Sequence, residues 1–210
     1  MARRHRRGAR ARAASHQDPP KNWDSLAALR VILGRTQPAA RVLDAGAATY
    51  SVILPWLAAY GYQDLTGNNL LFGKPIKVGP ITYEQGDITK LRFADGSLDV
   101  VTCLSVIEHN VDVSGFLREA ARVLAPGGLL VVSMDYFDPP IDTKGAIAYG
   151  GPVKVFSAAD ARAMLDEARA LGLQPTSEPD LTCKDKCVTW SRFGLEFTFL
   201  LLTLQKLPKQ

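Results

Sequence analysis

The stretch Arg41 to Gly61, RVLDAGAATYSVILPWLAAYG, decides the fold of this chain. It opens with a short apolar strand, Arg41 to Asp44, and continues into a turn of small residues, Ala45 to Thr49. Apolar residues then recur at helical spacing from Val52 to Tyr60. Pro55 lies near the first turn of this helix, where its missing N–H costs least. A strand, a small-residue turn and a helix therefore follow one another here.

The rest of the chain repeats this alternation of strands and helices. We expect further strands at Asp64–Gly67, Ile81–Gln85, Leu98–Leu104 and Leu129–Met134. The third of these is almost entirely apolar, which is typical of a strand that is buried on both faces in a parallel sheet. Apolar residues at three-and-four spacing predict a helix over Val113–Leu124, and Pro126-Gly127-Gly128 turns the chain into the next strand.

Two more helices and a hairpin complete the predicted fold. Asn22 or Asp24 can cap a leading helix that stops near Gly34 and carries one apolar face, made of Leu26, Leu29, Ile32 and Leu33. Ser157 to Asp160 resembles a capping box that opens a helix ending at Gly172. The last strands leave no room for a crossover helix, so they form an antiparallel hairpin; their ranges are Thr176–Thr182, or a stretch near Val188–Trp190, followed by Phe197–Gln205. The fold class is α/β, with seven mostly parallel strands between two helical layers.

Composition agrees with one globular domain and a short appendage. The chain has 210 residues, of which 47% are hydrophobic and 22% are charged, and this length suits a single domain. We place that domain at residues 21–210. The three cysteines are an odd number and have no further ligands at zinc spacing, so we expect neither a disulfide scaffold nor a metal site.

Positive charge is concentrated at the start of the chain. Met1 to His16 contains six arginines and no acid, and removing this +6 from the net charge of +4 leaves −2 for the remaining residues. Recognition of nucleic acid needs basic residues gathered on a folded face, so we expect no nucleic acid partner for the body. Residues 1–20 are predicted to be a basic, disordered, solvated tail; organellar targeting and contact with an acidic surface are the less favoured alternatives.

Apolar runs in the sequence are short. The longest, Leu195 to Leu204, is interrupted by Glu196 and Thr198 and falls well below the roughly 20 residues that span a bilayer. The tail lacks the apolar segment of a secretory signal. We therefore expect a soluble, cytoplasmic protein.

Small and polar residues follow the successive predicted strands. In an open α/β sheet, ligands bind beyond the carboxyl ends of the strands. Gly46 follows the first strand, Asn68-Asn69 the second, Asp87 the third, Ser105 to His109 the fourth, and Asp135-Tyr136 the fifth. This series predicts one nucleoside-like ligand that lies across the sheet edge.

Five pieces of sequence occur in a characteristic order: VLDAGAA at 42–48, LTGNNL at 65–70, GDITKLRFADGSLDVV at 86–101, SVIEH at 105–109 and FLREAARVLAPGGLLVVS at 116–133. Together they resemble the class I S-adenosylmethionine-dependent methyltransferases, in particular the type 11 group of small-molecule enzymes. The resemblance covers Arg41 to Ser133 and, more loosely, the closing hairpin. It implies a three-layer Rossmann-like fold, a small-molecule acceptor and S-adenosyl-L-methionine as the cofactor.

The resemblance also implies roles for individual residues. Asp44 and Gly46 would hold the methionine end of the cofactor, and Asp87 with Ile88 would contact the adenine, although Asp87 can also serve a turn through Asx geometry. The expected cofactor-binding residues are Asp44, Gly46, Ala48, Asn68, Asn69, Asp87, Ile88 and Leu104.

Two of these positions depart from the family pattern. Asn69 stands where the family commonly has an acid that binds both ribose hydroxyls, and Ala48 stands where it usually has glycine. A hydrogen bond to a charged acceptor is stronger than one to a neutral acceptor. We therefore expect the amide either to weaken the cofactor affinity or to pass the ribose to Asn68, and the methyl group of Ala48 to narrow the pocket.

Catalysis by such a site depends mainly on alignment of the acceptor with the methyl group, and a hydroxyl acceptor also gains from a general base. His109 is the only histidine outside the tail and follows a strand end, so it is the favoured base. Glu108, Asp135 and Tyr136 are weaker candidates. The aromatic and acidic residues of Asp135 to Val155 favour a polar or glycosylated metabolite as acceptor.

Two other classes of function remain as alternatives. A nicotinamide oxidoreductase requires G-x-G-x-x-G after the first strand and an acid closing the second, and the chain has neither. A methyltransferase-like domain that has lost catalysis and binds a partner is the stronger alternative, because Ala48 and Asn69 depart from the family pattern.

Overall fold

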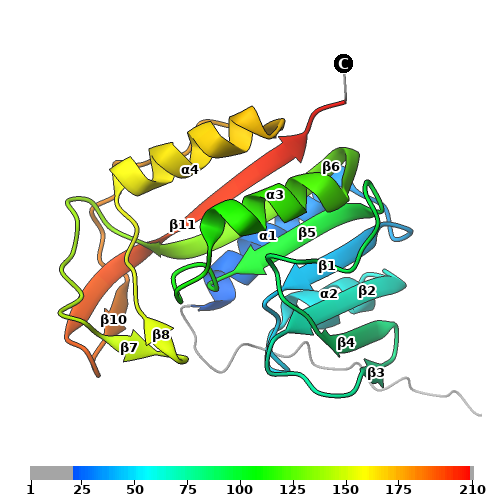
Figure 1. Ribbon diagram of the computed structural model, residues 1–210, viewed down its shortest axis with the longest axis horizontal. Helices are drawn as coiled ribbons and strands as arrows, with labels where there is room; N and C mark the ends of the chain where they lie inside the picture. Colours follow the sequence, from blue (N-terminus) through cyan, green and yellow to red (C-terminus); the bar gives the residue numbers. More distant parts are fainter. Residues whose placement is uncertain (1–20, 209–210) are drawn as a thin grey trace, which may run out of the picture.

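The computed structural model describes residues 21–208, and the predicted basic tail of residues 1–20 lies outside the described residues. A nine-stranded sheet crosses the molecule (Figure 1). Five of its strands run parallel in the order β4-β2-β1-β5-β6. Their bounds are β1 Arg41–Ala45, β2 Asp64–Asn69, β4 Ile81–Gln85, β5 Leu98–Leu104 and β6 Leu124–Tyr136.

Antiparallel strands complete both sides of this parallel core. β3, Ile76–Val78, pairs with β4 at one edge of the sheet. β11, Leu195–Lys206, pairs along β6 on the other side, and both β10, Val188–Trp190, and β9, Leu173–Pro175, pair with β11. The predicted mixed sheet with a terminal antiparallel hairpin is confirmed.

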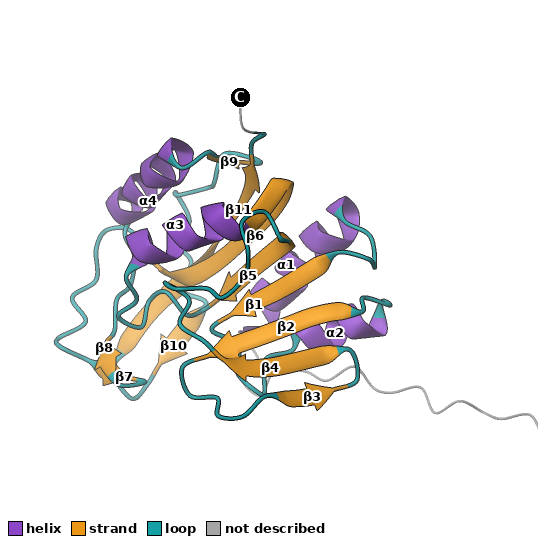
Figure 2. Cartoon of the chain, turned by 45° about the vertical axis from the view of Figure 1, so that its right-hand side comes forward, coloured by secondary structure: helices purple, strands orange, loops and turns teal. Residues whose placement is uncertain are grey.

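Two helices cover each face of the sheet (Figures 1 and 2). The helices α1, Lys21–Arg35, and α2, Ile53–Ala59, pack in one apolar cluster with Val42 and Val100. α3, Val113–Val123, and α4, Ala158–Ala170, pack in another cluster with Leu43 and Val101. Neighbouring residues of one strand thus enter opposite layers, as the pleat of a strand requires. The three-layer arrangement is therefore confirmed.

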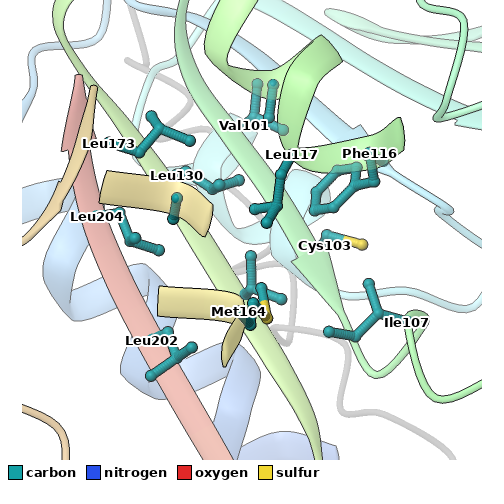
Figure 3. Packing of buried hydrophobic residues seen from close by; sticks show 14 of the residues in the cluster. Val101, Cys103, Ile107, Phe116, Leu117, Leu130, Met164, Leu173, Leu202 and Leu204 are labelled. Atoms are coloured by element: carbon teal, nitrogen blue, oxygen red, sulfur yellow. The ribbon is translucent and has the colours of Figure 1, made fainter. Parts of the chain in front are cut away.

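The cluster under α3 and α4 is the larger of the two. Figure 3 shows Phe116 and Leu117 of α3 lying over Val101 and Cys103 of β5, and Leu202 and Leu204 of β11 continue the same layer. The side chain of Phe116 has no exposed surface. Burial of this kind supplies most of the driving force for folding.

Several predicted boundaries are wrong in detail. The sequence predicts seven strands; the structure adds β3 and contains both β9 and β10, whereas only one strand was expected before β11. No strand lies at 176–182, because β9 ends at Pro175, whereas the alternative stretch at Val188–Trp190 is confirmed as β10. Leu26 was placed on the apolar face of the leading helix, but it is 55% exposed. The buried stripe of α1 contains Ala28, Leu29 and Ile32.

Local signals at helix ends predict their positions well. Ser157 and Asp160 form the predicted capping box at the start of α4, with hydrogen bonds in both directions. Pro55 is the third residue of α2, within the first turn as expected. Pro126-Gly127-Gly128 forms a bulge within β6, where the register against β5 shifts from Leu124 to Leu129.

A small hairpin follows β6. Its strands are β7, Ile147–Ala148, and β8, Gly151–Pro152, and it lies in the long insertion before α4. Within residues 21–208, none of the helices has the length and apolar character that a bilayer crossing requires.

Replacing Phe116 with alanine tests the importance of the larger cluster. Phe116→Ala removes a fully buried ring, and we expect the free energy of unfolding to fall by about 3–5 kcal/mol. Leu71→Ala is the matched control, because Leu71 is 88% exposed and its loss should change the free energy by less than about 0.5 kcal/mol. Urea denaturation followed by circular dichroism measures both values; equal effects would contradict the assignment.

Candidate active site

The five parallel strands end at the same edge of the sheet (Figure 2). The loops that follow β1, β4 and β5 begin with Gly46, Gly86 and Ser105. The predicted site residues gather along this edge. Some of them belong to the strands rather than to the loops, since β2 extends to Asn69 and β6 to Tyr136.

Gly46 forms a turn that no other residue fits easily. Its φ of +84° lies in the left-handed region that favours glycine. A Cβ at this position would lie 2.6 Å from a methyl carbon of Val106, in the loop after β5. The turn after β1 and the loop after β5 are therefore in close contact.

Two asparagine side chains hold the Gly46 turn against β2. The Gly46 N–H donates to the backbone oxygen of Asn68 at 2.9 Å and to its side-chain oxygen at 3.3 Å. The Asn69 amide nitrogen donates to the carbonyls of Gly46 and Ala47, at 3.2 and 2.9 Å. Asn69 also accepts the Leu71 N–H at 2.9 Å. We call this set of bonds the asparagine clamp.

The end of β4 contacts the same pair of asparagines. The Gly86 N–H donates to the Asn69 carbonyl at 3.2 Å, and a Cβ on Gly86 would lie 2.7 Å from the Asn68 amide nitrogen. Asp87 follows directly. Gly46, Asn69 and Asp87 thus border one region, as the sequence predicts.

Two alanines continue the turn, and Ala48 is the one that stands where the family usually has glycine. Ala47 is buried and lies close to β2, since a Cβ added to Gly67 would lie 2.9 Å from the Cβ of Ala47. Ala48 donates its N–H to the Ser51 hydroxyl at 2.9 Å, and the Ser51 N–H donates back to the Ala48 carbonyl at 3.0 Å. These contacts fix the backbone where glycine would leave it free.

Asp44 is a buried carboxyl directly before this turn. It is 3% exposed and accepts a hydrogen bond of 2.7 Å from the Thr102 hydroxyl. The pKa of Asp44 is raised to about 7, mainly by burial and in part by the nearby charge of Asp24, while the Thr102 hydrogen bond opposes the shift. A cation placed beside Asp44 would favour its charged form.

Asp24 of α1 is a second buried acid at this edge, and the sequence analysis did not assign it to the site. It is 1% exposed and accepts hydrogen bonds from the hydroxyls of Ser105, at 3.0 Å, and Ser133, at 2.8 Å. Its spacing of four residues from Ala28 puts it on the buried stripe of α1. That spacing is the signal that could have identified it.

Ser105 takes an unusual backbone conformation at the end of β5. Its φ is +53°, in the left-handed region that non-glycine residues seldom adopt. The Ser105 N–H donates to the Ser133 hydroxyl at 2.9 Å, while its own hydroxyl donates to Asp24. These bonds hold the start of the loop that carries Glu108 and His109.

Asp87 and Ile88 follow β4. One Asp87 carboxylate oxygen accepts the Thr89 N–H at 2.8 Å and the Thr89 hydroxyl at 2.7 Å, which is the Asx geometry considered above. These bonds lower the pKa of Asp87, so the carboxylate stays charged at neutral pH. Ile88 is 8% exposed and belongs to the larger apolar cluster.

Glu108 and His109 lie together after β5. Glu108 is fully buried, and one of its oxygens lies 4.0 Å from His109 Nε2. The His109 ring packs near Tyr149, with centroids 4.7 Å apart, and near Trp190, at 6.5 Å. The insertion after β6 and strand β10 therefore form a wall beside the predicted base.

The predicted pair Asp135-Tyr136 lies within β6 and not beyond it. Asp135 is 2% exposed and shares its strand face with Ser133, two residues earlier. Tyr136 is buried on the other face, and its hydroxyl donates to the Leu181 carbonyl at 2.7 Å. Tyr136 thus lies on the opposite face of β6 from Asp135. Leu104 ends β5 and packs against the α1–α2 cluster.

Comparison with known proteins agrees with this geometry. Residues 43–132 match the family model described as a methyltransferase domain, of the type 11 group. This segment contains the Gly46 turn, the asparagine clamp and the Glu108–His109 pair. Over these 90 residues, which are less than half of the chain, it is similar to the class I methyltransferases of the type 11 group.

Relatives of this methyltransferase domain include curated proteins and solved structures. The demethylmenaquinone methyltransferase of Mycobacterium marinum is 38% identical over 118 residues, which are 55% of this chain and 49% of that protein. The 27-O-demethylrifamycin SV methyltransferase of Amycolatopsis mediterranei is 35% identical over 109 residues, 49% of this chain and 39% of that protein. The chain thus spans about half or less of these relatives.

A solved structure shares the fold over most of the chain. The 1,6-didemethyltoxoflavin-N1-methyltransferase of Burkholderia thailandensis superposes with a TM-score of 0.64 and 18% identity, covering 91% of this chain and 80% of that protein. Asp24 and the wall formed by the insertion and β10 lie outside the segment that the family model matches.

Replacing Asp44 in the methyltransferase domain tests its raised pKa. Between pH 4 and 7 the Asp44 carboxyl loses its proton in the unfolded state but keeps it in the folded state. Asp44 therefore lowers the free energy of unfolding progressively as the pH rises to 7, and the full loss is present above pH 7. We expect Asp44→Asn to raise the free energy of unfolding at pH 8 by up to about 4 kcal/mol and to change it little at pH 4. Urea denaturation at both pH values measures the difference.

Asp99→Asn is the matched control for Asp44→Asn. Arg41 donates three hydrogen bonds to Asp99 and lowers its pKa, so Asp99 stabilises the folded state above its unfolded pKa. We expect Asp99→Asn to lower stability at pH 8, the opposite sign to Asp44→Asn. If both variants were destabilised at pH 8, the interpretation of Asp44 would be wrong.

Proposed function

We propose that this chain transfers a methyl group from S-adenosylmethionine to a hydroxyl of a polar or glycosylated small molecule. The observation that carries the proposal is the Gly46 turn, which brings the ends of β1, β2, β4 and β5 together through Val106, Asn69 and Gly86. A bare backbone beside a buried carboxyl suits the amino acid end of this cofactor.

Different residues around the turn bind different parts of the cofactor in this proposal. S-adenosylmethionine, when bound, supplies an electrophilic methyl group. The methionine end lies against the Gly46 and Ala48 turn, and Asp44 meets its ammonium charge. Asp87 accepts from the adenine amine and Ile88 packs on the ring, while Leu104 and the asparagine clamp complete the site. This assignment follows the family resemblance and agrees with the positions of these residues.

The acceptor side lies toward the ends of β5 and β6. His109 is 16% exposed in its side chain and lies beside the buried Glu108, which can orient the imidazole. In this proposal the imidazole of His109 takes the proton of the acceptor hydroxyl. Glu108 and Asp135 are the weaker candidates for the same role.

Two relatives illustrate the range of acceptors in this family. The enzyme of Mycobacterium marinum is named for the acceptor demethylmenaquinone, and that of Amycolatopsis mediterranei for 27-O-demethylrifamycin SV. The insertion of this chain contains Tyr149, which is 74% exposed, together with Asp138 and Asp142. That mixture of ring and carboxylate supports a polar acceptor of medium size.

Calorimetric titration tests the cofactor assignment. We expect S-adenosylmethionine and S-adenosylhomocysteine to bind with micromolar dissociation constants. Gly46→Ala should abolish binding, because its Cβ would clash with Val106 at a positive φ. Gly73→Ala is the matched control, since a Cβ at Gly73 meets nothing within 4 Å. No binding at millimolar cofactor would instead support a domain that only binds a partner.

Replacing His109 tests the proposed base. We expect His109→Gln, which keeps much of the packing volume, to lower turnover about 10²–10⁴-fold and to change the dissociation constant of S-adenosylhomocysteine less than about twofold. Turnover is measured on an acceptor found by screening hydroxylated metabolites. Unchanged turnover would remove His109 from the mechanism, and a parallel loss of cofactor affinity would indicate a structural role.

A further inference from the structure

The side chain of Asn69 is almost fully used within the protein. An amide group has two N–H donors and an oxygen with two lone pairs. Its nitrogen donates to the carbonyls of Gly46 and Ala47, and its oxygen accepts the Leu71 N–H. One acceptor position therefore remains, and both donors are committed to the Gly46 turn.

An acid at this position could not form the same bonds. A carboxylate only accepts hydrogen bonds, so an aspartate at 69 would face the carbonyl oxygens of Gly46 and Ala47 without a donor. The clamp and a bidentate ribose contact are thus alternative uses of one side chain. In this chain the structure assigns Asn69 to the clamp.

Asn68 cannot take over a ribose contact. It is 2% exposed, its oxygen accepts the Gly46 N–H, and Gly86 lies directly against its amide nitrogen. The expectation that the ribose passes to Asn68 is therefore not supported by its position.

The neighbouring acids are also engaged. Both carboxylate oxygens of Glu84 accept hydrogen bonds from Arg92, and one oxygen of Asp87 holds Thr89. The segment from Asn69 to Pro80 contains no acid and two lysines, Lys74 and Lys77. Within the described part of the chain, the side chains at the end of β2 thus offer a ribose diol one neutral acceptor, the Asn69 oxygen.

We propose that this chain does not recognise both ribose hydroxyls of its adenosyl cofactor at the end of β2, and that it accepts adenosyl ligands altered at the ribose. The inference rests on the proposed function. A hydrogen bond to a charged acceptor changes affinity roughly 10- to 150-fold, and one to a neutral acceptor roughly 2- to 13-fold. Removing the ribose hydroxyl that contacts Asn69 should therefore lower the affinity for the ligand only slightly. Removing the other ribose hydroxyl should hardly change the affinity.

Calorimetry on the unaltered full chain tests the inference with S-adenosylhomocysteine and its 2′-deoxy and 3′-deoxy analogues. We expect one analogue to bind within about threefold of the parent compound and the other within about tenfold. A larger loss for either analogue overturns the inference and leaves the proposed function intact. No binding of the parent compound overturns both.

Asn69→Asp separates the clamp from a ribose contact. If the clamp is the role of Asn69, the variant loses both donor bonds, and we expect S-adenosylhomocysteine to bind about 5- to 50-fold more weakly and the thermal midpoint to fall. Tighter binding by Asn69→Asp would overturn the inference.

Gln85→Ala is the control: it removes a bond from Gln85 Nε2 to the Leu70 carbonyl at the same edge and should change the affinity less than twofold. The analogue series decides the matter if Asn69→Asp does not fold.

Discussion

The hydrogen bonds between the Gly46 turn and the two asparagines of β2 are the constraint on which the candidate site depends. They fix the N–H and the carbonyl of Gly46 from the same side, while Val106 fills the space where a side chain would stand. Ends of strands that are distant in sequence are thereby held in one place. A loop fixed in this way loses little conformational freedom when a ligand binds, which favours affinity.

Buried acids beside this turn lower the stability of the fold. Asp44 and Asp24 are both buried in the layer that α1 and α2 form, and the charge of Asp24 contributes to the raised pKa of Asp44. Burying a carboxylate is costly unless hydrogen bonds satisfy it, and here hydroxyls of Thr102, Ser105 and Ser133 do so. A buried acid with a raised pKa, such as Asp44, is typical of a functional site.

Much of the fold could be predicted from sequence because strong local signals agree with the global arrangement. The ranges Ile81–Gln85 and Leu98–Leu104 are observed as predicted, since buried strands read as continuous or alternating apolar runs. The three-residue strands β3 and β9 carry too little pattern to be recognised. Leu26 was misplaced because the buried stripe of α1 includes a polar residue, Asp24, that a search for apolar spacing passes over.

The site was only partly accessible to sequence reasoning, for a different reason. Position relative to strand ends predicted that Gly46, Asn69 and Asp87 would converge, and they do. Position could not show what each side chain binds. That Asn69 donates to Gly46 and Ala47, that Tyr136 lies on the opposite face of β6 from Asp135, and that Asp24 reaches Ser105 and Ser133 are consequences of three-dimensional packing.

Gly46 and Val106 lie sixty residues apart in the chain but share one space, so the size of the side chain allowed at one position depends on the residue at the other. A bulkier residue than valine at 106 would press on the bare backbone of the turn, and a smaller one would leave a void between the two loops. Related chains that keep this glycine should therefore vary little in size at position 106. A shortened side chain there is the simplest way to enlarge the space next to the turn without altering any hydrogen bond that holds it.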